Sequence, residues 1–183
     1  FLQGEQAALL AASKIVQSVP DLDSKFYAAT QVMDEARHVE AYQKLMGKFG
    51  VAYPMTDPLQ ELVNDALKDS RWDVTYLAMQ VVIEGLALAA FGTIRDIAQN
   101  PLARMVNAYV MEDESRHVAF GRLSLRDYYP QLPQAERDER EEFLVEACYL
   151  MRDRMTQGTI VYETLGLPAE ECKQFADQSE IVQ

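Results

Sequence analysis

The sequence predicts an all-α protein built on a four-helix bundle, and three observations lead to this prediction. The chain has 8 glycines and 7 prolines among 183 residues, and most of them lie between long stretches with helical patterning. No stretch shows the alternation of apolar and polar residues, bounded by hairpin turns, that is typical of strands. Two connections between long helices are short, which indicates antiparallel neighbours, and the longer connection between these pairs suits a crossover.

Residues that start or end helices place the individual elements. Helical geometry is disfavoured before Pro20, so the first helix ends there, and Asp21 or Asp23 is expected to cap the second. Residues 50–58 contain two prolines and form the long connection. Pro101 lies in the first turn of a later helix, where its missing N–H costs nothing. The expected helices span about residues 1–19, 24–49, 59–68, 70–99, 101–128, 134–165 and 168–179.

We expect one domain over residues 1–183, with the four-helix core in residues 1–128 and accessory helices in residues 134–183. The helix at 134–165 carries an apolar stripe that either covers the core or forms a dimer interface, and we expect the protein to be a homodimer. This stripe consists of Phe143, Leu144, Ala147, Leu150, Met151 and Ile160.

Composition excludes several classes of protein. The formal net charge of -12 disfavours a nucleic-acid binder, which presents a basic surface to phosphates. No run of 18 or more apolar residues is present, so we expect no membrane span. Cys148 and Cys172 are too few for a disulfide scaffold and are not spaced as a zinc site, so we expect a cytoplasmic location. Helical patterning already runs at Phe1, and we therefore expect a further segment to precede it.

A short motif occurs twice and carries the strongest functional signal. Residues 34–38 are D-E-A-R-H and residues 113–117 are D-E-S-R-H, so the copies lie 79 residues apart on the second and fourth long helices. Each copy contains Glu-x-x-His, and side chains at i and i+3 share one helical face. The chain has only two histidines, His38 and His117, and both lie in these motifs. The copies predict a repeat of two helical hairpins, each presenting a carboxylate and an imidazole to the interior.

Two further glutamates complete a predicted metal site. Glu5 on the first helix precedes Glu35 by 30 residues. Glu84, in an apolar stretch where a lone buried carboxylate is costly, precedes Glu114 by the same distance. One Glu from each of two helices, with Glu-x-x-His from the other two, is the donor set of a two-metal site in a bundle. Carboxylates with imidazoles suit iron or manganese, whereas structural zinc prefers thiolates. The predicted catalytic and metal-binding residues are Glu5, Glu35, His38, Glu84, Glu114 and His117.

The repeated Asp and Arg are expected to support the two histidines. A metal-bound imidazole usually donates its other N–H to a carboxylate or carbonyl, so we expect the aspartate of each copy to accept from the histidine of the other copy. The arginines would pair with these aspartates, and the alternative is that both residue types form ordinary surface salt bridges. The expected pairs are Asp34 with His117 and Asp113 with His38, and the arginines are Arg37 and Arg116.

As a set, these residues resemble the ferritin-like di-iron carboxylate superfamily over about residues 1–128. The duplicated D-E-x-R-H most resembles its oxygen-activating branch, which includes hydroxylase subunits of bacterial multicomponent monooxygenases and the small subunits of ribonucleotide reductases. The resemblance implies a ferritin-like fold, two iron ions or a manganese/iron pair, and O2 as co-substrate. It also implies oxidation of a C–H or N–H bond of a small apolar organic substrate. An external electron donor is expected, because no flavin or iron–sulfur motif is present.

Other relatives define alternatives. Bacterioferritins also carry Glu-x-x-His twice, so iron storage with ferroxidase activity stays an alternative. In ribonucleotide reductase small subunits a radical tyrosine lies four residues after the first ligating histidine, and Tyr42 holds that position after His38. The other role for Tyr42 is in the core or the pocket lining. Arylamine N-oxygenases use a third histidine ligand, so the histidine count of this chain is expected to exclude that group.

The substrate pocket is expected on the inward face, within one or two turns of the predicted ligands. Most of its lining residues are small or apolar, which favours an apolar or amphipathic organic substrate; the alternative is that they form only the bundle core. These residues are Leu9, Gln80, Ala87, Leu88, Met111 and Gly121.

Overall fold

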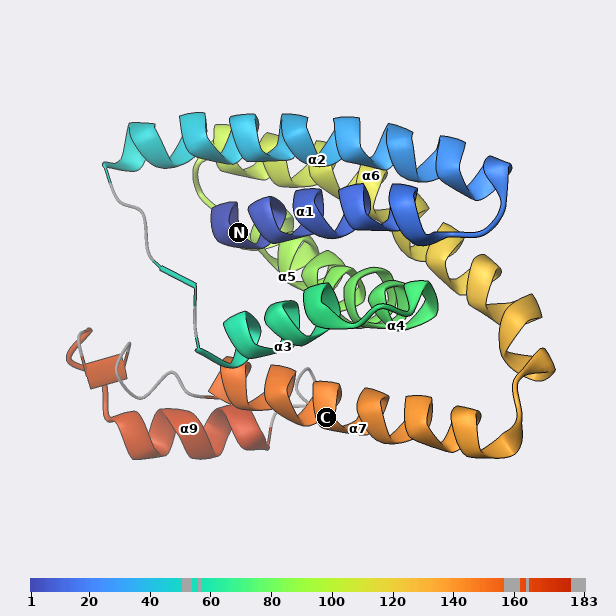
Figure 1. Ribbon diagram of the computed structural model, residues 1–183. Helices are drawn as coiled ribbons and strands as arrows, with labels where there is room; N and C mark the ends of the chain where they lie inside the picture. The colour runs from blue at the N-terminus through green and yellow to red at the C-terminus, as the bar shows by residue number, and fades with distance from the viewer. Residues whose placement is uncertain (51–53, 56, 157–161, 164, 179–183) are drawn as a thin grey trace.

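The computed structural model describes residues 1–50, 54–55, 57–156, 162–163 and 165–178, and every element in these residues is helical (Figure 1). The predicted all-α fold is confirmed. The elements are α1 (Leu2–Ser18), α2 (Leu22–Phe49), α3 (Asp57–Lys68), α4 (Trp72–Tyr76), the π-helical segment η1 (Leu77–Ile83), α5 (Glu84–Ile97), α6 (Pro101–Tyr128), the 3-10 turn η2 (Tyr129–Gln131), α7 (Gln134–Thr156) and α9 (Ala169–Asp177).

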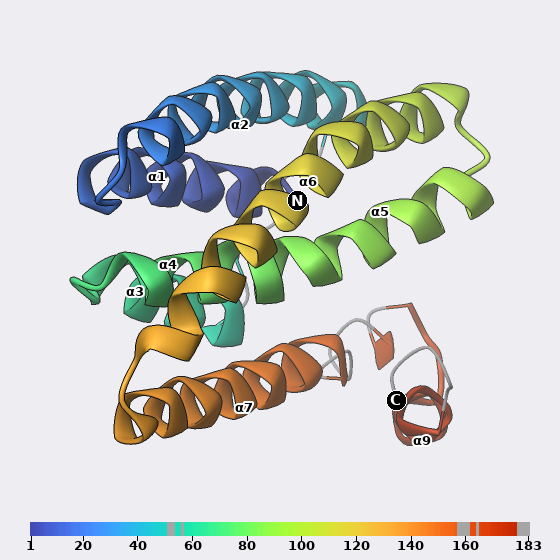
Figure 2. The same cartoon turned by 90° about the vertical axis from the view of Figure 1, so that its right-hand side faces the viewer.

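Two antiparallel helical hairpins form the bundle. α1 packs along α2, the continuous helix α4–η1–α5 packs along α6, and the two hairpins face each other (Figure 2). α3 belongs to the crossover between the hairpins and packs against α7, α1 and η1. This is the bundle with a crossover connection that the sequence predicts.

Side-chain caps fix where the two longest helices begin. The Asp21 carboxylate accepts a hydrogen bond from the Ser24 backbone N–H at 2.8 Å, so Asp21 rather than Asp23 caps α2. The Asn100 side-chain oxygen accepts from the Leu102 backbone N–H at 2.9 Å and caps α6. Both helices that carry a D-E-x-R-H copy are therefore fixed at their N-termini by a local hydrogen bond.

The helix expected at 70–99 contains a π-helical segment that the sequence does not predict. This segment, Leu77–Ile83, lies directly before Glu84, and π-helical turns occur often at functional sites. It packs on α6 at Gly121, where an added Cβ atom would lie 2.6 Å from the Gln80 Cβ. Only glycine permits so close an approach. The packing of α6 on η1 therefore fixes where Gln80 enters the bundle.

The apolar face of α7 covers the core. Ala147 and Met151 are each 1% exposed and pack in one hydrophobic cluster with Met79 of η1. Of the two roles expected for this stripe, covering the core is confirmed, and the homodimer stays a prediction. The helix expected at 134–165 is described as α7 up to its end at Thr156, and Ile160, the last member of the stripe, lies outside the described residues.

One continuous helix, Trp72–Ile97, is long and apolar enough to cross a membrane by length and composition alone. In the structure it packs against α6, α7 and α1 and carries the buried Glu84. Its apolar character matches this position in the bundle, and the expected absence of a membrane span stays a prediction.

A buried ion pair ties α7 to α4, and we predict that the stability of the fold depends on it. Arg140 Nε donates to Asp73 Oδ2 at 2.9 Å, and both side chains are at most 4% exposed. Removing one partner leaves the other charge buried and uncompensated, so Arg140→Met is expected to lower the free energy of unfolding by about 3 kcal/mol or more. Urea denaturation followed by circular dichroism measures this loss.

The control for this prediction is Arg137→Met, at an exposed position one turn earlier on α7. It is expected to change the free energy of unfolding by less than about 0.5 kcal/mol. An equally small effect of Arg140→Met would contradict the role of the buried pair.

Candidate metal centre

The structure brings the six predicted ligands together inside the bundle, from helices α1, α2, α5 and α6. Each of them is at most 5% exposed. Their donor atoms form two groups, and within each group the atoms all lie within 4.8 Å of one another. Glu35 and Glu114 belong to both groups; the first is completed by Glu5 and His38, and the second by Glu84 and His117. The arrangement therefore has places for two ions, with two carboxylates in common.

Each imidazole is oriented by the aspartate of the other motif, as the sequence predicts. His38 Nε2 lies 3.1 Å from Asp113 Oδ2. His117 Nε2 lies 3.2 Å from Asp34 Oδ2. With Nε2–H donated to an aspartate, the Nδ1 atom of each ring is left to face the glutamates.

The Nδ1 atoms and the carboxylate oxygens converge on a common space. His38 Nδ1 lies 3.1 Å from Glu114 Oε1, and His117 Nδ1 lies 3.2 Å from Glu35 Oε1. Yet four buried atoms make no hydrogen bond with any residue that the structure describes: His117 Nδ1 and one oxygen each of Glu35, Glu84 and Glu114. Buried polar atoms without partners are rare and costly, and nitrogen and carboxylate donors of this kind suit iron. The residues present therefore fit a pair of metal ions.

The two aspartates are paired in turn with the arginines of the repeat. Arg37 bonds to Asp34 on its own helix and lies 3.3 Å from Asp113 across the bundle. Arg116 bonds to Asp113 on its own helix and lies 3.9 Å from Asp34. The expected pairing is present. Because the arginine side chains are more than half exposed, each pair contributes little free energy by itself, and its effect is to offset the charge of the aspartates.

Burial and mutual contacts shift the pKa values within the cluster in both directions. Burial raises the pKa of Glu5 to about 7 against the effect of a hydrogen bond with His38, and burial raises the pKa of Glu84 well above its usual value. Burial opposes ionisation of Glu35, but its close contacts with both imidazoles outweigh this effect and lower the pKa to about 2. Burial would also lower the pKa of each imidazole, but close contacts with glutamate carboxylates outweigh this effect. The pKa of His117 rises to about 11, and that of His38 rises as well.

The structure adds one residue to the site that the sequence analysis does not identify. Gln31 is 2% exposed and donates its Nε2 to Glu35 Oε1 at 3.2 Å and to Glu84 Oε1 at 3.1 Å. Gln80, which was expected to line the pocket, donates its own Nε2 to Gln31 Oε1 at 3.0 Å. The signal that could have identified the pair is a glutamine four residues before both Glu35 and Glu84, on the same helical face as each carboxylate.

Tyr42 is 1% exposed and packs in an aromatic group near the cluster. Its hydroxyl donates to Asn107 Oδ1 at 2.9 Å, and its ring stacks with those of Phe1 and Phe91. Burial, together with the nearby charge of Glu5, raises the pKa of Tyr42 above its ordinary value. The core role expected for Tyr42 is therefore confirmed, and a radical role stays a prediction.

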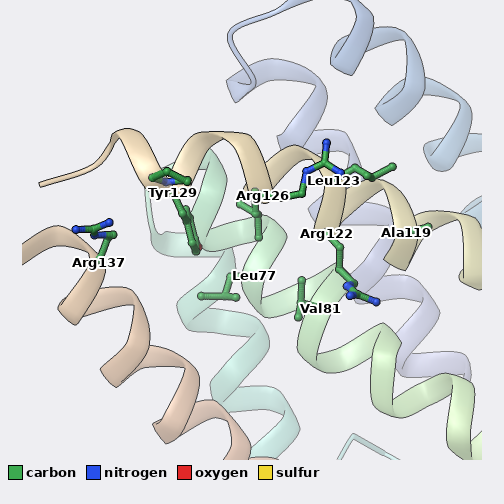
Figure 3. A pocket seen from close by; sticks show the side chains of 10 residues that line it. Leu77, Val81, Ala119, Arg122, Leu123, Arg126, Tyr129 and Arg137 are labelled. Atoms are coloured by element: carbon green, nitrogen blue, oxygen red, sulfur yellow. The ribbon is translucent and has the colours of Figure 1, made fainter. Parts of the chain in front are cut away.

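An open groove of about 760 Å³ is lined by residues of η1, α6, η2 and α7 (Figure 3). Leu77 and Val81 contribute apolar surface, and Arg122, Arg126 and Arg137 lie around it. None of the six predicted ligands and none of the residues expected to line the substrate pocket borders this groove. It is therefore separate from the metal centre.

Comparison with known families identifies the group to which this arrangement belongs. The family model described as p-aminobenzoate N-oxygenase AurF matches residues 8–177. The chain belongs to the AurF family. This is a family of di-iron oxygenases that use O2, so the predicted di-iron, oxygen-activating enzyme is confirmed, as is its place in the oxygen-activating branch. No curated protein matches the chain.

The AurF match corrects two expectations. It continues to residue 177, through α7 and α9, so the resemblance is not confined to residues 1–128. The expectation that the histidine count excludes arylamine N-oxygenases is wrong, since the matching family carries the name of an enzyme of that kind. The match extends over nearly all the helices, whereas the exclusion of arylamine N-oxygenases relied on a single ligand position. Each donor group already holds one imidazole and three carboxylates. Glu5 lies just before the matched residues, and the other five predicted ligands lie within them.

We predict that metal binding at this centre strengthens as the pH rises. An ion needs unprotonated ligands, and the raised pKa values leave His38 and His117 protonated at neutral pH. Binding of two ions is therefore expected to release at least about two protons, one from each imidazole, and the affinity for each ion to rise at least about tenfold per pH unit between pH 6 and 8. Anaerobic calorimetric titration with Fe(II), in buffers of different ionisation enthalpy, measures both quantities. A constant or falling affinity over this range would contradict the prediction.

Proposed function

We propose that this member of the AurF family is an N-oxygenase that inserts one atom of O2 into an N–H bond of a small aromatic amine. The observation that carries the proposal is the pair of overlapping donor groups, which share Glu35 and Glu114. Both groups are buried, and each contains one imidazole and three carboxylates. The family match supports an amine as the substrate class, because the family is named for an enzyme that acts on p-aminobenzoate.

The ligands divide between the two ions in this proposal. Glu5 and His38 would hold one ion and Glu84 and His117 the other, and Glu35 and Glu114 belong to both donor groups. When bound, the iron pair supplies the oxidising chemistry with O2. The protein holds a proton on each histidine Nε2, in the bond to Asp34 or Asp113, and so directs Nδ1 at the metal. Burial opposes ionisation of Asp113, but its bonds with His38 and Arg116 lower its pKa and keep it a charged acceptor.

The reaction needs an external electron donor. Conversion of R–NH2, O2, two electrons and two protons to R–NHOH and water consumes two electrons that the amine does not supply in this step. The lack of a flavin or iron–sulfur motif in the sequence supports a separate reductase or ferredoxin as their source. A homodimer and a cytoplasmic location are proposed on the sequence evidence alone.

We predict how the iron content depends on the two kinds of ligand. Glu35→Ala removes a shared carboxylate and is expected to lower the bound iron from about two ions per chain to less than one, whereas Glu84→Ala is expected to leave about one. The double variant Glu114→Ala/His117→Ala is expected to bind none. A colorimetric iron assay after anaerobic loading and desalting measures these values. The control is Glu112→Ala, at an exposed position on α6, the helix that carries Glu114 and His117, and it is expected to leave the iron content unchanged. An unchanged iron content in the double variant would contradict the metal centre.

We also predict that the iron-loaded protein, supplied with a reductant and O2, converts p-aminobenzoate to an N-oxygenated product. With 18O2, the new N–O bond is expected to carry the label, which chromatography with mass spectrometry detects. The variant Glu114→Ala/His117→Ala is expected to form no product. Accumulation of a ferric mineral with many irons per chain, without any product, would contradict oxygenase activity and indicate iron storage.

A further inference from the structure

The two buried glutamines beside the metal centre form a chain of hydrogen bonds with a fixed direction. The carboxylate oxygens of Glu35 and Glu84 accept, so the Gln31 amide has to present its NH2 group to them. Its carbonyl oxygen then faces Gln80, which presents its own NH2 group at 3.0 Å. The chain ends at Gln80 Oε1, a buried acceptor for which no residue in the described part of the protein offers a donor.

The internal repeat shows that this amide chain exists on one side of the centre only. The shift of 79 residues that relates the two D-E-x-R-H copies relates Gln31 to Val110 and Gln80 to Phe1. Val110 is buried in an apolar cluster with aromatic side chains, and Phe1 packs against the same rings. The ligands thus repeat in both halves, but the residues one turn before them are amides on one flank and apolar on the other.

Backbone packing holds Gln80 in a defined place. Its Cβ faces Gly121 of α6 so closely that a Cβ atom added there would lie 2.6 Å away. The side chain is 1% exposed, and its NH2 group is bonded to Gln31. The carbonyl oxygen is the side-chain atom of Gln80 that has no hydrogen-bond partner among the described residues, and an unpaired buried acceptor costs free energy until a donor reaches it.

We infer that Gln80 Oε1 accepts a hydrogen bond from an N–H or O–H group of the substrate, which makes Gln80 a specificity-determining residue. The inference rests on the proposed function, because it assigns the ligand chemistry of the same centre. A donor at this point completes the chain that runs through Gln31 to Glu35 and Glu84. The side of the centre that carries Gln31 and Gln80 therefore binds the polar group of a small molecule.

Such a contact discriminates mainly by lowering the affinity for compounds that have no hydrogen-bond donor. A compound without a donor leaves Gln80 Oε1 buried and unpaired, whereas a compound with N–H or O–H satisfies it. Toluene, aniline and phenol have similar size and differ in a methyl, an amino and a hydroxyl group. Comparison of their affinities isolates the contribution of the donor.

The test is anaerobic calorimetric titration of the Fe(II)-loaded and of the metal-free protein with these three probes. The unsubstituted protein is expected to bind aniline and phenol about tenfold more tightly than toluene. Gln80→Met keeps the length of the side chain without its amide and is expected to bring this ratio to about one. Gln80→Asn retains an amide but withdraws it by one methylene, so it is expected to give an intermediate ratio and serves if the methionine variant does not fold. Gln60→Met, the same exchange at an exposed position on α3, is the control and is expected to leave the ratio unchanged.

Equal affinities for the three probes in the unsubstituted protein would overturn the inference, and so would an undiminished preference in both Gln80 variants. These outcomes are separate from those that test the proposed function. A lack of N-oxygenated product with an intact preference contradicts the oxygenase activity and leaves the Gln80 contact in place. Product formation without any preference among the three probes contradicts the Gln80 contact and leaves the oxygenase activity in place.

Discussion

The centre of this protein depends on the balance of charge around four carboxylates buried in an apolar bundle. An unpaired buried charge destabilises a fold by several kcal/mol, so each negative charge needs a partner. Without metal, protons offset part of this charge, because the pKa values of both imidazoles are raised by the carboxylates, and burial raises the pKa values of Glu84 and Glu5. Two divalent ions would carry four positive charges against the four carboxylates. Protons and metal are thus alternative partners for the same carboxylates, which is why we expect metal affinity to depend on pH.

The twofold construction of the bundle meets this requirement with few residues. Each hairpin brings one glutamate from its first helix and Glu-x-x-His from its second, and the aspartate and arginine of each motif balance each other one layer further out. A strict repeat would also make the two flanks of the centre identical. Gln31 and Gln80 break that identity, because their repeat-related positions hold Val110 and Phe1. The asymmetry gives a symmetric ligand set one side that can distinguish polar from apolar molecules.

The ligands could be predicted from sequence because their signals are local or periodic. Glu-x-x-His depends only on helical geometry, and equal spacings of 30 residues in both halves tie Glu5 and Glu84 to the motifs. The crossed pairing of aspartates with histidines followed from the chemistry of metal-bound imidazole. The spacing of four residues relates Gln31 to Glu35, but its bond to Glu84, 53 residues away, does not follow from any local pattern. The π-helical segment η1 packs on Gly121 of α6, and no local pattern in the sequence records that contact.

The histidine count shows how a correct motif can still lead to a wrong exclusion. A third imidazole would bind metal as a neutral ligand, so its presence or absence leaves the charge of the buried cluster unchanged. A missing carboxylate would change that charge, and the structure accordingly keeps all four glutamates at most 5% exposed. Each donor group has one imidazole that is oriented through an aspartate, so both ions can be held without a third. Membership of the AurF family is therefore compatible with two histidines, because each donor group keeps three buried carboxylates and one imidazole.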